Sequence, residues 1–375
     1  MTLTVLTDAE IRPLLEGLTA SELAGFQRAL KETLHQYSTG AQLPEKDQGS
    51  IHQPERISVH NKVTGATTLF MPSCSPAGQG VKVITLSSAE NQQPPQTGES
   101  AEAEGQEPGT ETKKKVIKPT GAITLFDPEG SPAGILHAST LTAFRTALAS
   151  VSLVDRRDKV ETLTVFGVGE QAYWHVRLSL MVRGSTIRQV NFINRRFSPA
   201  CKEILRRFLT TGTTSSDDDT DGPIVGGVPA ETKAREGWTD CKFGILTPTY
   251  NQYSALLAQQ VRDADVIFCC TPSTEALFDG RILTEDNEAR KKGRLIVAIG
   301  SYTPQMREIP LELIRQATKQ TSHEHQHKLH LPHIHIHRHK HAVEGGVVIV
   351  DTLDGALKEA GELIEAGLVP SQLVE

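Results

Sequence analysis

A short glycine-rich segment, Gly167-Val-Gly-Glu-Gln-Ala172, offers backbone donors at a spacing that suits a phosphate ligand. It follows a stretch with strand propensity that starts at Glu161, and it precedes a helical-looking stretch from Tyr173 to Met181. Strand, tight glycine turn and helix in this order form the pyrophosphate site of dinucleotide-binding folds. Gly167 would permit the sharp turn, and Gly169 would let N–H groups at the helix start reach the phosphates. One such motif by itself is a weak signal of nucleotide binding, so the interpretation depends on the neighbouring sequence.

A basic segment, Asn194-Arg195-Arg196, follows the next expected strand, from Ile187 to Ile193. NAD-preferring folds usually place Asp or Glu at this point, where the carboxylate accepts hydrogen bonds from the adenosine ribose. Two guanidinium groups can instead bind the additional phosphate of NADP through charge-assisted hydrogen bonds. The segment therefore predicts a nucleotide-binding domain that prefers NADP(H), with NAD(H) as the second possibility. The alternative interpretation is an ordinary basic loop.

Three basic residues in the N-terminal part of the chain could bind a carboxylate. They are Arg56, Lys82 and Arg145, each among apolar or turn-forming neighbours. Lys82 stands between two valines of an expected strand, where a charge is costly unless it is paired. Taken singly, each residue is an ordinary surface or paired residue. Together with a nicotinamide-binding domain, they predict a cationic pocket for a substrate carboxylate.

Several further segments occur in the order typical of one protein family. They are Gln53-Pro-Glu-Arg56, Gly80-Val-Lys-Val83, Leu141-Thr-Ala-Phe-Arg-Thr-Ala147, Ala264-Asp-Val-Ile267, Ile299-Gly-Ser-Tyr-Thr-Pro-Gln-Met-Arg-Glu308 and Val348-Ile-Val-Asp-Thr352. With the glycine turn and the Asn-Arg-Arg segment, they span nearly the whole chain apart from its low-complexity inserts. The chain resembles the ornithine cyclodeaminase/mu-crystallin family. The resemblance implies a homodimer whose first domain supplies substrate binding and dimerisation, with the C-terminal helix returning to that domain.

The resemblance also implies roles for individual residues. Together with the motifs, it predicts that these residues contact the cofactor: Gly167, Gly169, Glu170, Gln171, Asn194, Arg195, Arg196, Thr271 and Thr352. It predicts that these residues contact the substrate: Arg56, Lys82, Arg145, Tyr302 and Leu353. Catalytic roles fall to Arg56, Lys82 and Arg145, which would hold the carboxylate and polarise the reacting centre.

One departure from the family pattern bears on the reaction. Ornithine cyclodeaminases carry an Asp two residues before the Pro of the Gly-x-x-x-Pro segment, and this chain has Tyr302 there, before Pro304. Without that carboxylate, the acid–base handling of a diamine loses support. We therefore expect an NAD(P)H-dependent oxidoreductase that reduces a ketimine of a 2-oxo acid, or oxidises an amino acid in reverse. Two alternatives stay open: an ornithine cyclodeaminase, a lyase forming L-proline and ammonia from L-ornithine, and a non-catalytic NADP-binding protein.

Composition narrows the class of protein. The chain has 375 residues and a formal net charge of −6, so nucleic acid is not an expected partner. Its apolar runs are too short to span a bilayer, and acidic residues from Asp8 onward argue against a targeting peptide. Five cysteines without a C-x-x-C pair suit reduced thiols in the cytosol. We expect a cytoplasmic protein that binds a small amino or imino acid.

The fold class predicted by these patterns is α/β. We expect a Rossmann-type NAD(P)-binding domain at 153–344 and an α+β substrate-binding and dimerisation domain formed by 1–152 and 345–375. The segments Thr64–Gly78 and Thr120–Gly134 match at eleven of fifteen positions, which predicts two similar strand–turn units in one sheet.

Three low-complexity inserts interrupt these domains, at about 89–119, 211–236 and 318–341. The last contains alternating histidines from His333 to His341, which an extended chain would place on one face. A metal site needs ligands held in a fixed geometry, which a flexible repeat does not supply. We therefore expect a solvated insert and no defined metal site.

Overall fold

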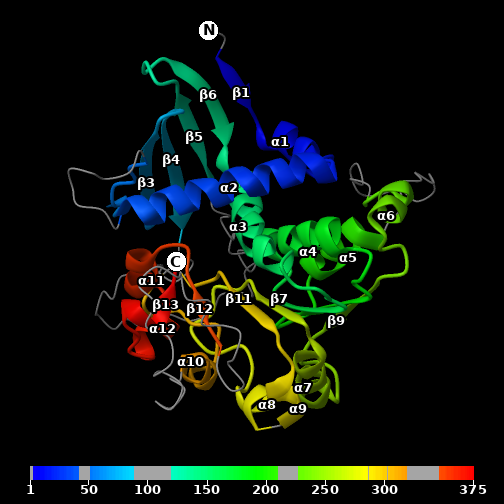
Figure 1. Ribbon diagram of the computed structural model, residues 1–375. Helices are drawn as coiled ribbons and strands as arrows, with labels where there is room; N and C mark the ends of the chain where they lie inside the picture. The colour runs from blue at the N-terminus through cyan, green and yellow to red at the C-terminus, as the bar shows by residue number, and fades with distance from the viewer. Residues whose placement is uncertain are drawn as a thin grey trace, which may run out of the picture. The chain divides into compact units, whose positions relative to one another are not determined.

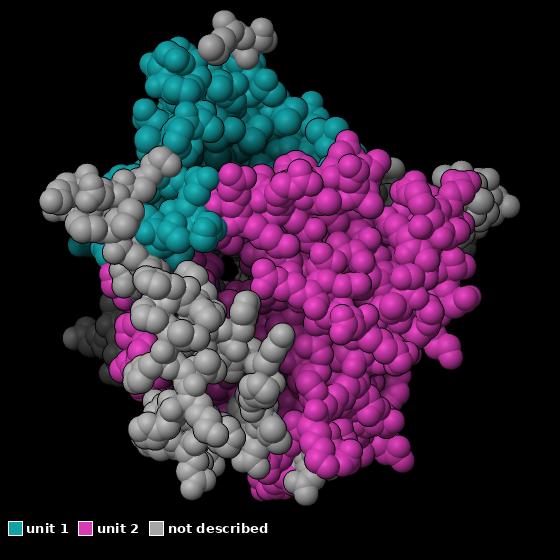
Figure 2. All heavy atoms as spheres, viewed as in Figure 1, with its two compact units in different colours: residues 1–18, 35–142 teal, residues 19–34, 143–375 magenta. Residues whose placement is uncertain are grey.

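The computed structural model describes residues 3–41, 51–87, 120–209, 227–285, 287–301, 303–318 and 346–375 (Figure 1). The chain divides into two compact units (Figure 2). Unit 1 comprises residues 1–18 and 35–142, and unit 2 comprises residues 19–34 and 143–375. The sequence-based division, which extends the first domain to 152 and adds 345–375, stays a prediction. The insert at about 89–119, and all but the first residue of that at 318–341, lie outside the described residues.

Unit 1 is built on a six-stranded sheet in the order β1-β6-β5-β4-β3-β2. The strands are β1 (Thr4–Leu6), β2 (Ile57–His60), β3 (Ala66–Ser75), β4 (Gly78–Ser87), β5 (Thr120–Phe126) and β6 (Pro132–His137). Only the β1–β6 pair is parallel. The repeated sequence units fall on β3 and β5, each of which forms a hairpin with the strand after it, and β4 joins the two hairpins. The prediction of similar neighbouring units in one sheet is confirmed.

Apolar residues at helical spacing, Leu14, Leu15, Leu18, Leu23, Phe26 and Leu30, predict one helical region from Asp8 to Tyr37. The structure has two helices there, α1 (Asp8–Glu16) and α2 (Ala20–Ala41). The chain turns between them at Gly17, whose N–H donates to the carbonyl of Pro13. Ile11, Leu15 and Leu23 are buried, whereas the predicted apolar positions Leu14 and Phe26 are exposed. The periodicity located the helices correctly but misassigned part of their buried face.

The sequence predicts a helix that opens after Thr140 or Thr142, and the observed helix α3 (Ala138–Val154) begins before these residues. Asp8 accepts hydrogen bonds from the N–H and the hydroxyl of Thr140, both at 2.9 Å. A carboxylate that satisfies N–H donors in the first turn stabilises a helix start. Because this carboxylate comes from a residue 132 positions earlier, the sequence around α3 did not reveal it.

Unit 2 contains a five-stranded parallel sheet in the order β11-β10-β7-β8-β9. The strands are β7 (Thr162–Phe166), β8 (Gln189–Ile193), β9 (Lys242–Leu246), β10 (Val266–Cys269) and β11 (Leu295–Ala298). The sequence predicts strands at 163–166, 189–193, 266–270 and 295–299, because strands covered on both faces read as continuous apolar runs. All but β9 were thus predicted at nearly their observed bounds. In Figure 1, α4 (Glu170–Arg183) and α5 (Pro199–Leu209) lie on one side of the sheet and α7 (Tyr253–Asp263) on the other. This is the doubly wound Rossmann architecture that the sequence predicted.

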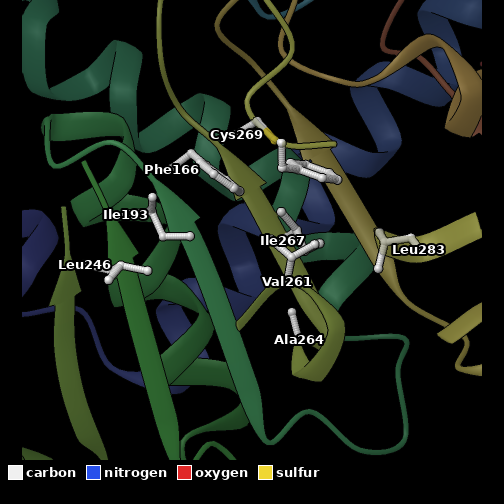
Figure 3. Packing of buried hydrophobic residues seen from close by; sticks show 9 residues of the cluster. Phe166, Ile193, Leu246, Val261, Ala264, Ile267, Cys269 and Leu283 are labelled. Carbon is white, nitrogen blue, oxygen red and sulfur yellow. The ribbon is translucent and has the colours of Figure 1, made fainter. Parts of the chain in front are cut away.

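One buried cluster fills the space beside the carboxyl half of this sheet (Figure 3). Phe166, Ile193 and Cys269 at the strand ends share it with Val261 of α7. Phe166 stacks on Phe278, with ring centroids 5.5 Å apart. The apolar run from Asp265 to Cys270 predicts that Cys269 and Cys270 are both core residues; Cys269 is buried, whereas Cys270 is only partly buried. The cluster holds the ends of β7, β8 and β10 rigidly where a ligand site is expected.

The remaining elements of unit 2 are short. They are α6 (Ala230–Glu236), α8 (Arg281–Thr284), α9 (Asn287–Lys291), α10 (Leu311–Ala317), β12 (Val348–Ile349), α11 (Leu353–Glu359), α12 (Gly361–Glu365) and β13 (Leu373–Val374). The sequence predicts one final helix from Gly355 to Ala366, and the structure divides it in two at Ala360. Within the described ranges, no helix is long and apolar enough to cross a membrane. Nor do those ranges contain three or more His, Cys, Asp or Glu side chains grouped to hold a metal ion.

The predicted insert at 211–236 is wrong for its second part, because residues 227–236 belong to the fold. Arg177 of α4 makes a paired hydrogen bond with Glu236, at 2.6 and 2.8 Å, and both side chains are buried. The indole of Trp238 donates to the same carboxylate at 2.7 Å. Low apolar content suggested a loop, but charge-assisted hydrogen bonds join this segment to the fold in addition to the burial of Val228.

Candidate functional site

The predicted pyrophosphate turn lies at the carboxyl edge of the parallel sheet of unit 2. The chain proceeds from β7 outward to β9 and then crosses back to β10, so the strand order reverses between β7 and β10. Ligands of open α/β sheets bind at this point, outside the carboxyl ends of the strands. Gly167, with φ of +101°, follows β7, and Thr271 follows β10 closely. Gly167 and Thr271, which are far apart in the sequence and are both predicted to contact the cofactor, therefore meet at the switch point.

The backbones at the switch point approach one another tightly. The N–H of Cys270 donates to the carbonyl of Phe166 at 3.0 Å. A Cβ on Gly167 would lie 2.8 Å from the Cys270 carbonyl oxygen and 3.2 Å from Cγ2 of Thr271. Both the positive φ and this contact require glycine at position 167.

The start of α4 fits a phosphate group. Gly169 is the N-cap and has no side chain to satisfy the first N–H groups of the helix, which include those of Glu170 and Gln171. A Cβ on Gly169 would meet no atom within 4 Å, so the space above the helix start is open. Ala172 is fully buried, which lets α4 pack closely against the sheet. Open space in front of the first N–H groups of a helix is what an anion needs.

The side chain of Glu170 faces α5. Its carboxylate forms an ion pair with Arg207 at 3.2 Å, and the Arg207 guanidinium stacks over the Tyr173 ring at 3.1 Å from its centroid. The predicted contribution of Glu170 to the cofactor site would thus come from its main-chain N–H. Sequence reasoning missed Arg207, whose only signal is its place in the basic last turn of α5.

The basic segment after β8 forms a loop that its own side chains hold in shape. Nδ2 of Asn194 donates to the carbonyl of Arg196 at 2.7 Å and to Sγ of Cys201 at 3.4 Å. Arg195 and Arg196 are exposed. Asn194 therefore shapes the loop, while the two guanidinium groups face solvent at the sheet edge. Sequence reasoning also missed Cys201, which is buried in the first turn of α5 beside this loop.

The predicted substrate residues of unit 1 lie on its sheet. Lys82 stands in β4 between Met71 of β3 and Ile123 of β5, and it is half-buried. Buried Ile84 shares its face, since side chains two apart on a strand point the same way. The valines beside Lys82 point to the opposite face. Arg56 is exposed and immediately precedes β2, two strands away from β4 in the sheet.

The other predicted substrate residues belong to unit 2. Arg145 lies on the exposed side of α3, while its neighbours Ala143 and Phe144 are buried. Thr352 is the N-cap of α11, and Leu353 is its first residue, with its N–H donating to the Glu375 carboxylate at 3.2 Å. Tyr302 lies outside the described residues.

Sequence comparisons find distant relatives. No protein-family model matches the chain. The chain is 24% identical over 387 residues to an uncharacterized protein of Saccharomyces cerevisiae, covering 99% of this chain and 84% of that protein. It is 28% identical over 258 residues to a Delta(1)-pyrroline-2-carboxylate reductase of Bacillus cereus, and 24% identical over 249 residues to the ketimine reductase mu-crystallin of Mus musculus. These two matches cover 68% and 66% of this chain but only 59% and 55% of the two reductases.

Solved structures share the fold. The Delta(1)-pyrroline-2-carboxylate reductase of Thermococcus litoralis, in complex with NADH and L-proline, aligns with a TM-score of 0.60 at 16% identity, over 99% of this chain and 84% of that one. A probable ornithine cyclodeaminase from Bordetella pertussis Tohama I aligns with a TM-score of 0.60 at 20% identity, over 100% and 84%. The predicted fold class is confirmed. The motifs in family order, these relatives and the shared fold together support the resemblance to the ornithine cyclodeaminase/mu-crystallin family.

Proposed function

We propose that the chain is an NAD(P)H-dependent reductase that acts on a ketimine of a 2-oxo acid, or oxidises the corresponding amino acid in reverse. The observation that carries the proposal is the glycine turn at the β7–β10 switch point, with open space above the start of α4. Two of its sequence relatives are named as reductases, one of pyrroline-2-carboxylate and one of ketimines. A dinucleotide site and relatives of this kind support imine reduction.

The proposed cofactor is NADP(H), with NAD(H) as the weaker ligand. The N–H groups at the start of α4 would bind the pyrophosphate, and Thr271 and Thr352 would contact the remainder of the cofactor. The exposed Arg195 and Arg196 support the phosphorylated cofactor, because two guanidinium groups can bind the additional phosphate bidentately. When bound, the nicotinamide supplies the hydride that imine reduction requires.

The proposed substrate residues divide the remaining chemistry. The guanidinium groups of Arg56 and Arg145 would bind the carboxylate and fix its orientation. The ammonium group of Lys82 would donate a hydrogen bond or a proton to the imine nitrogen as it becomes an amine. Tyr302 and Leu353 would contact the rest of the substrate. Two guanidinium groups would thus lie at the negatively charged carboxylate, and an ammonium group would lie at the nitrogen that gains a proton. Cationic groups in these places stabilise the transition state relative to the free substrate.

Unit 1 carries an apolar surface that suits the homodimer implied by the family. Val5, Ile57, Val59 and Ile135 are 57, 60, 51 and 37% exposed. The strand registers put all four on one face of the sheet, opposite to the face of Lys82. Exposed apolar patches of this kind mark interaction sites. We propose that this face, from Val5 to Val59 across the sheet, joins two copies of the chain.

The cellular location is also a proposal. None of the five cysteines is in a disulfide. Free thiols suit the reducing conditions of the cytoplasm.

An ornithine cyclodeaminase is the second candidate, favoured by the shared fold with the Bordetella protein. The two activities differ in their products. The experiment is to incubate the purified protein with NADPH or NADH and a panel of cyclic ketimines and 2-oxo acids with amines, and to follow nicotinamide oxidation. Oxidation that depends on the ketimine supports the reductase. Ammonia release from L-ornithine without net cofactor change would establish the cyclodeaminase, and cofactor binding without turnover in either assay would leave only the binding protein.

A further inference from the structure

A buried carboxylate, that of Glu308, lies behind the cofactor edge of unit 2. Its side chain is completely buried. Oε1 accepts hydrogen bonds from the N–H of Thr271 at 2.7 Å and from the Thr271 hydroxyl at 3.0 Å. Oε2 accepts from the N–H groups of Ile299 and Gly300, at 3.1 and 2.6 Å. One carboxylate thus binds the segment after β10 to the segment after β11.

These two segments touch directly. A Cβ on Gly300 would lie 1.9 Å from the Thr271 carbonyl oxygen and 2.7 Å from Cδ of Glu308. Position 300 therefore accepts only glycine, and the segment after β11 is held against Thr271 and Glu308. Thr271 in turn lies beside Gly167 at the switch point. The chain of contacts runs from Glu308 through Thr271 to the glycine turn.

An ionised carboxylate suits this place better than any neutral side chain. All four contacts are donors, so a group with two acceptor oxygens satisfies them and an amide cannot. Burial raises the pKa of Glu308 to about 7, with a smaller contribution from the nearby Glu362, while the hydrogen bonds from Thr271 and Gly300 lower it. Cys269 and Cys270 also face this group, and burial together with the charge of Glu308 raises the pKa of both thiols well above the ordinary range.

We propose that Glu308 is a positioning residue for the nicotinamide half of the cofactor, because it holds Thr271 and Gly300 at the carboxyl ends of β10 and β11. The inference rests on the proposed function. In a doubly wound sheet, the dinucleotide lies across the switch point. The adenosine half is proposed to lie at β8, near Arg195 and Arg196, which leaves the nicotinamide half to the β10 side. Among the described residues, Glu308 accepts its hydrogen bonds from Thr271, Ile299 and Gly300, which lie on that side.

The test uses Glu308→Gln and compares two ligands. The amide nitrogen of Gln would face N–H donors, so at least one segment loses its acceptor. We expect the Kd for NADPH to rise roughly tenfold or more. The Kd for 2′-phospho-ADP-ribose, which lacks nicotinamide, should stay within about twofold, since additivity holds for distant sites. Glu236→Gln is the matched control, because it alters another buried carboxylate of unit 2 that holds Arg177 and Trp238.

A general loss of stability would weaken the binding of NADPH and of 2′-phospho-ADP-ribose equally, in both Glu308→Gln and Glu236→Gln. That result, or an unchanged Kd for NADPH in a folded Glu308→Gln protein, would overturn the positioning role while the proposed function stands. If Glu308→Gln does not fold, Glu308→Asp replaces it: its shorter carboxylate cannot span both segments, and the same selective loss is expected. Absence of NADPH and NADH binding in the unaltered protein would instead refute the proposed function, and this inference with it.

Discussion

Gly167 and Cys270 approach each other so closely that the carbonyl oxygen of Cys270 would lie 2.8 Å from a Cβ on Gly167. The contact joins the ends of β7 and β10, the two strands between which the sheet reverses its order. Backbone therefore fills the space on one side of the turn. Two residues later, at Gly169, the space is open. The two glycines of one motif consequently serve different purposes, the first structural and the second concerned with the ligand.

This difference predicts opposite results for two alanine substitutions. Gly167→Ala should destabilise the fold by about 1–3 kcal/mol, because of the positive φ and the close carbonyl. Gly169→Ala, at φ of −88°, should leave the melting temperature nearly unchanged but raise the Kd for the dinucleotide, since its methyl group occupies the proposed phosphate space. Thermal denaturation and titration with NADPH distinguish the two. Equal effects of both substitutions on stability would contradict this assignment.

Arg195 and Arg196 are the basis of the proposed NADP(H) preference. Replacing both by Ala should raise the Kd for NADPH far more than that for NADH. Losing one charged hydrogen bond costs about 1.5–3 kcal/mol, which corresponds to roughly ten- to a hundredfold in affinity. The charge-matched control replaces both Lys202 and Arg206, two exposed basic residues on α5, by Ala. Equal affinities of the unaltered protein for NADPH and NADH would refute the preference.

Lys82 is predicted to act in turnover more than in substrate affinity. Lys82→Ala should lower kcat strongly with a smaller change in KM, because its hydrogen bond to the imine nitrogen strengthens in the transition state. The control is Lys62→Ala, which removes an exposed lysine from the turn between β2 and β3. Steady-state kinetics with the best ketimine measure both constants. A normal kcat in the Lys82 variant would make it an ordinary paired strand residue.

Arg145 is predicted to bind the substrate carboxylate. Because its side chain lies on the exposed side of α3, Arg145→Ala should leave the melting temperature nearly unchanged. It should lower kcat/KM by roughly tenfold or more, since a charged hydrogen bond is lost, with little change in the Kd for NADPH. Calorimetric titration and kinetics test the two parts separately. Loss of cofactor affinity without loss of kcat/KM would reassign the residue to the cofactor.

His175 predicts an acid-sensitive contribution to stability. It is completely buried on α4, and burial lowers its pKa from 6.5 to about 4. In the unfolded chain, His175 therefore binds a proton below pH 6.5, whereas in the folded chain it stays neutral until about pH 4. The free energy of unfolding should fall across this window as pH falls, by up to about 3 kcal/mol.

Urea denaturation of the unaltered protein and of His175→Gln, at several pH values from 7 to 4, isolates this contribution. Between pH 4 and 6.5, the slope of unfolding free energy against pH should be less positive in the variant than in the unaltered protein. Glu308 acts in the opposite direction: its raised pKa makes stability fall as pH rises from 4.5 to about 7. Because that effect is present in both proteins, it cancels in the comparison. Parallel slopes would show that His175 does not titrate as described.

Local patterns predicted much of the nucleotide-binding unit. The glycine turn, the strands β7, β8, β10 and β11, and the Asn-Arg-Arg loop were all visible in the sequence, because continuous apolar runs and special turn residues are local signals. The repeated segments likewise predicted the paired hairpins of β3 to β6. The prediction failed where local polarity was misleading, as at 227–236, whose order depends on the buried pair of Arg177 and Glu236.

Other relationships exist only between residues that are distant in the chain. Asp8 satisfies the start of α3 from 132 positions away, and Glu308 binds Thr271 from 37 positions away. Hydrogen bonds of this kind leave no periodicity and no motif, since their specificity lies in the geometry of two separate segments. A single Glu at the end of a family segment gives no sign that four donors converge on it. Folding alone brings those donors together, because burying the carboxylate is favourable only when all of them are in place.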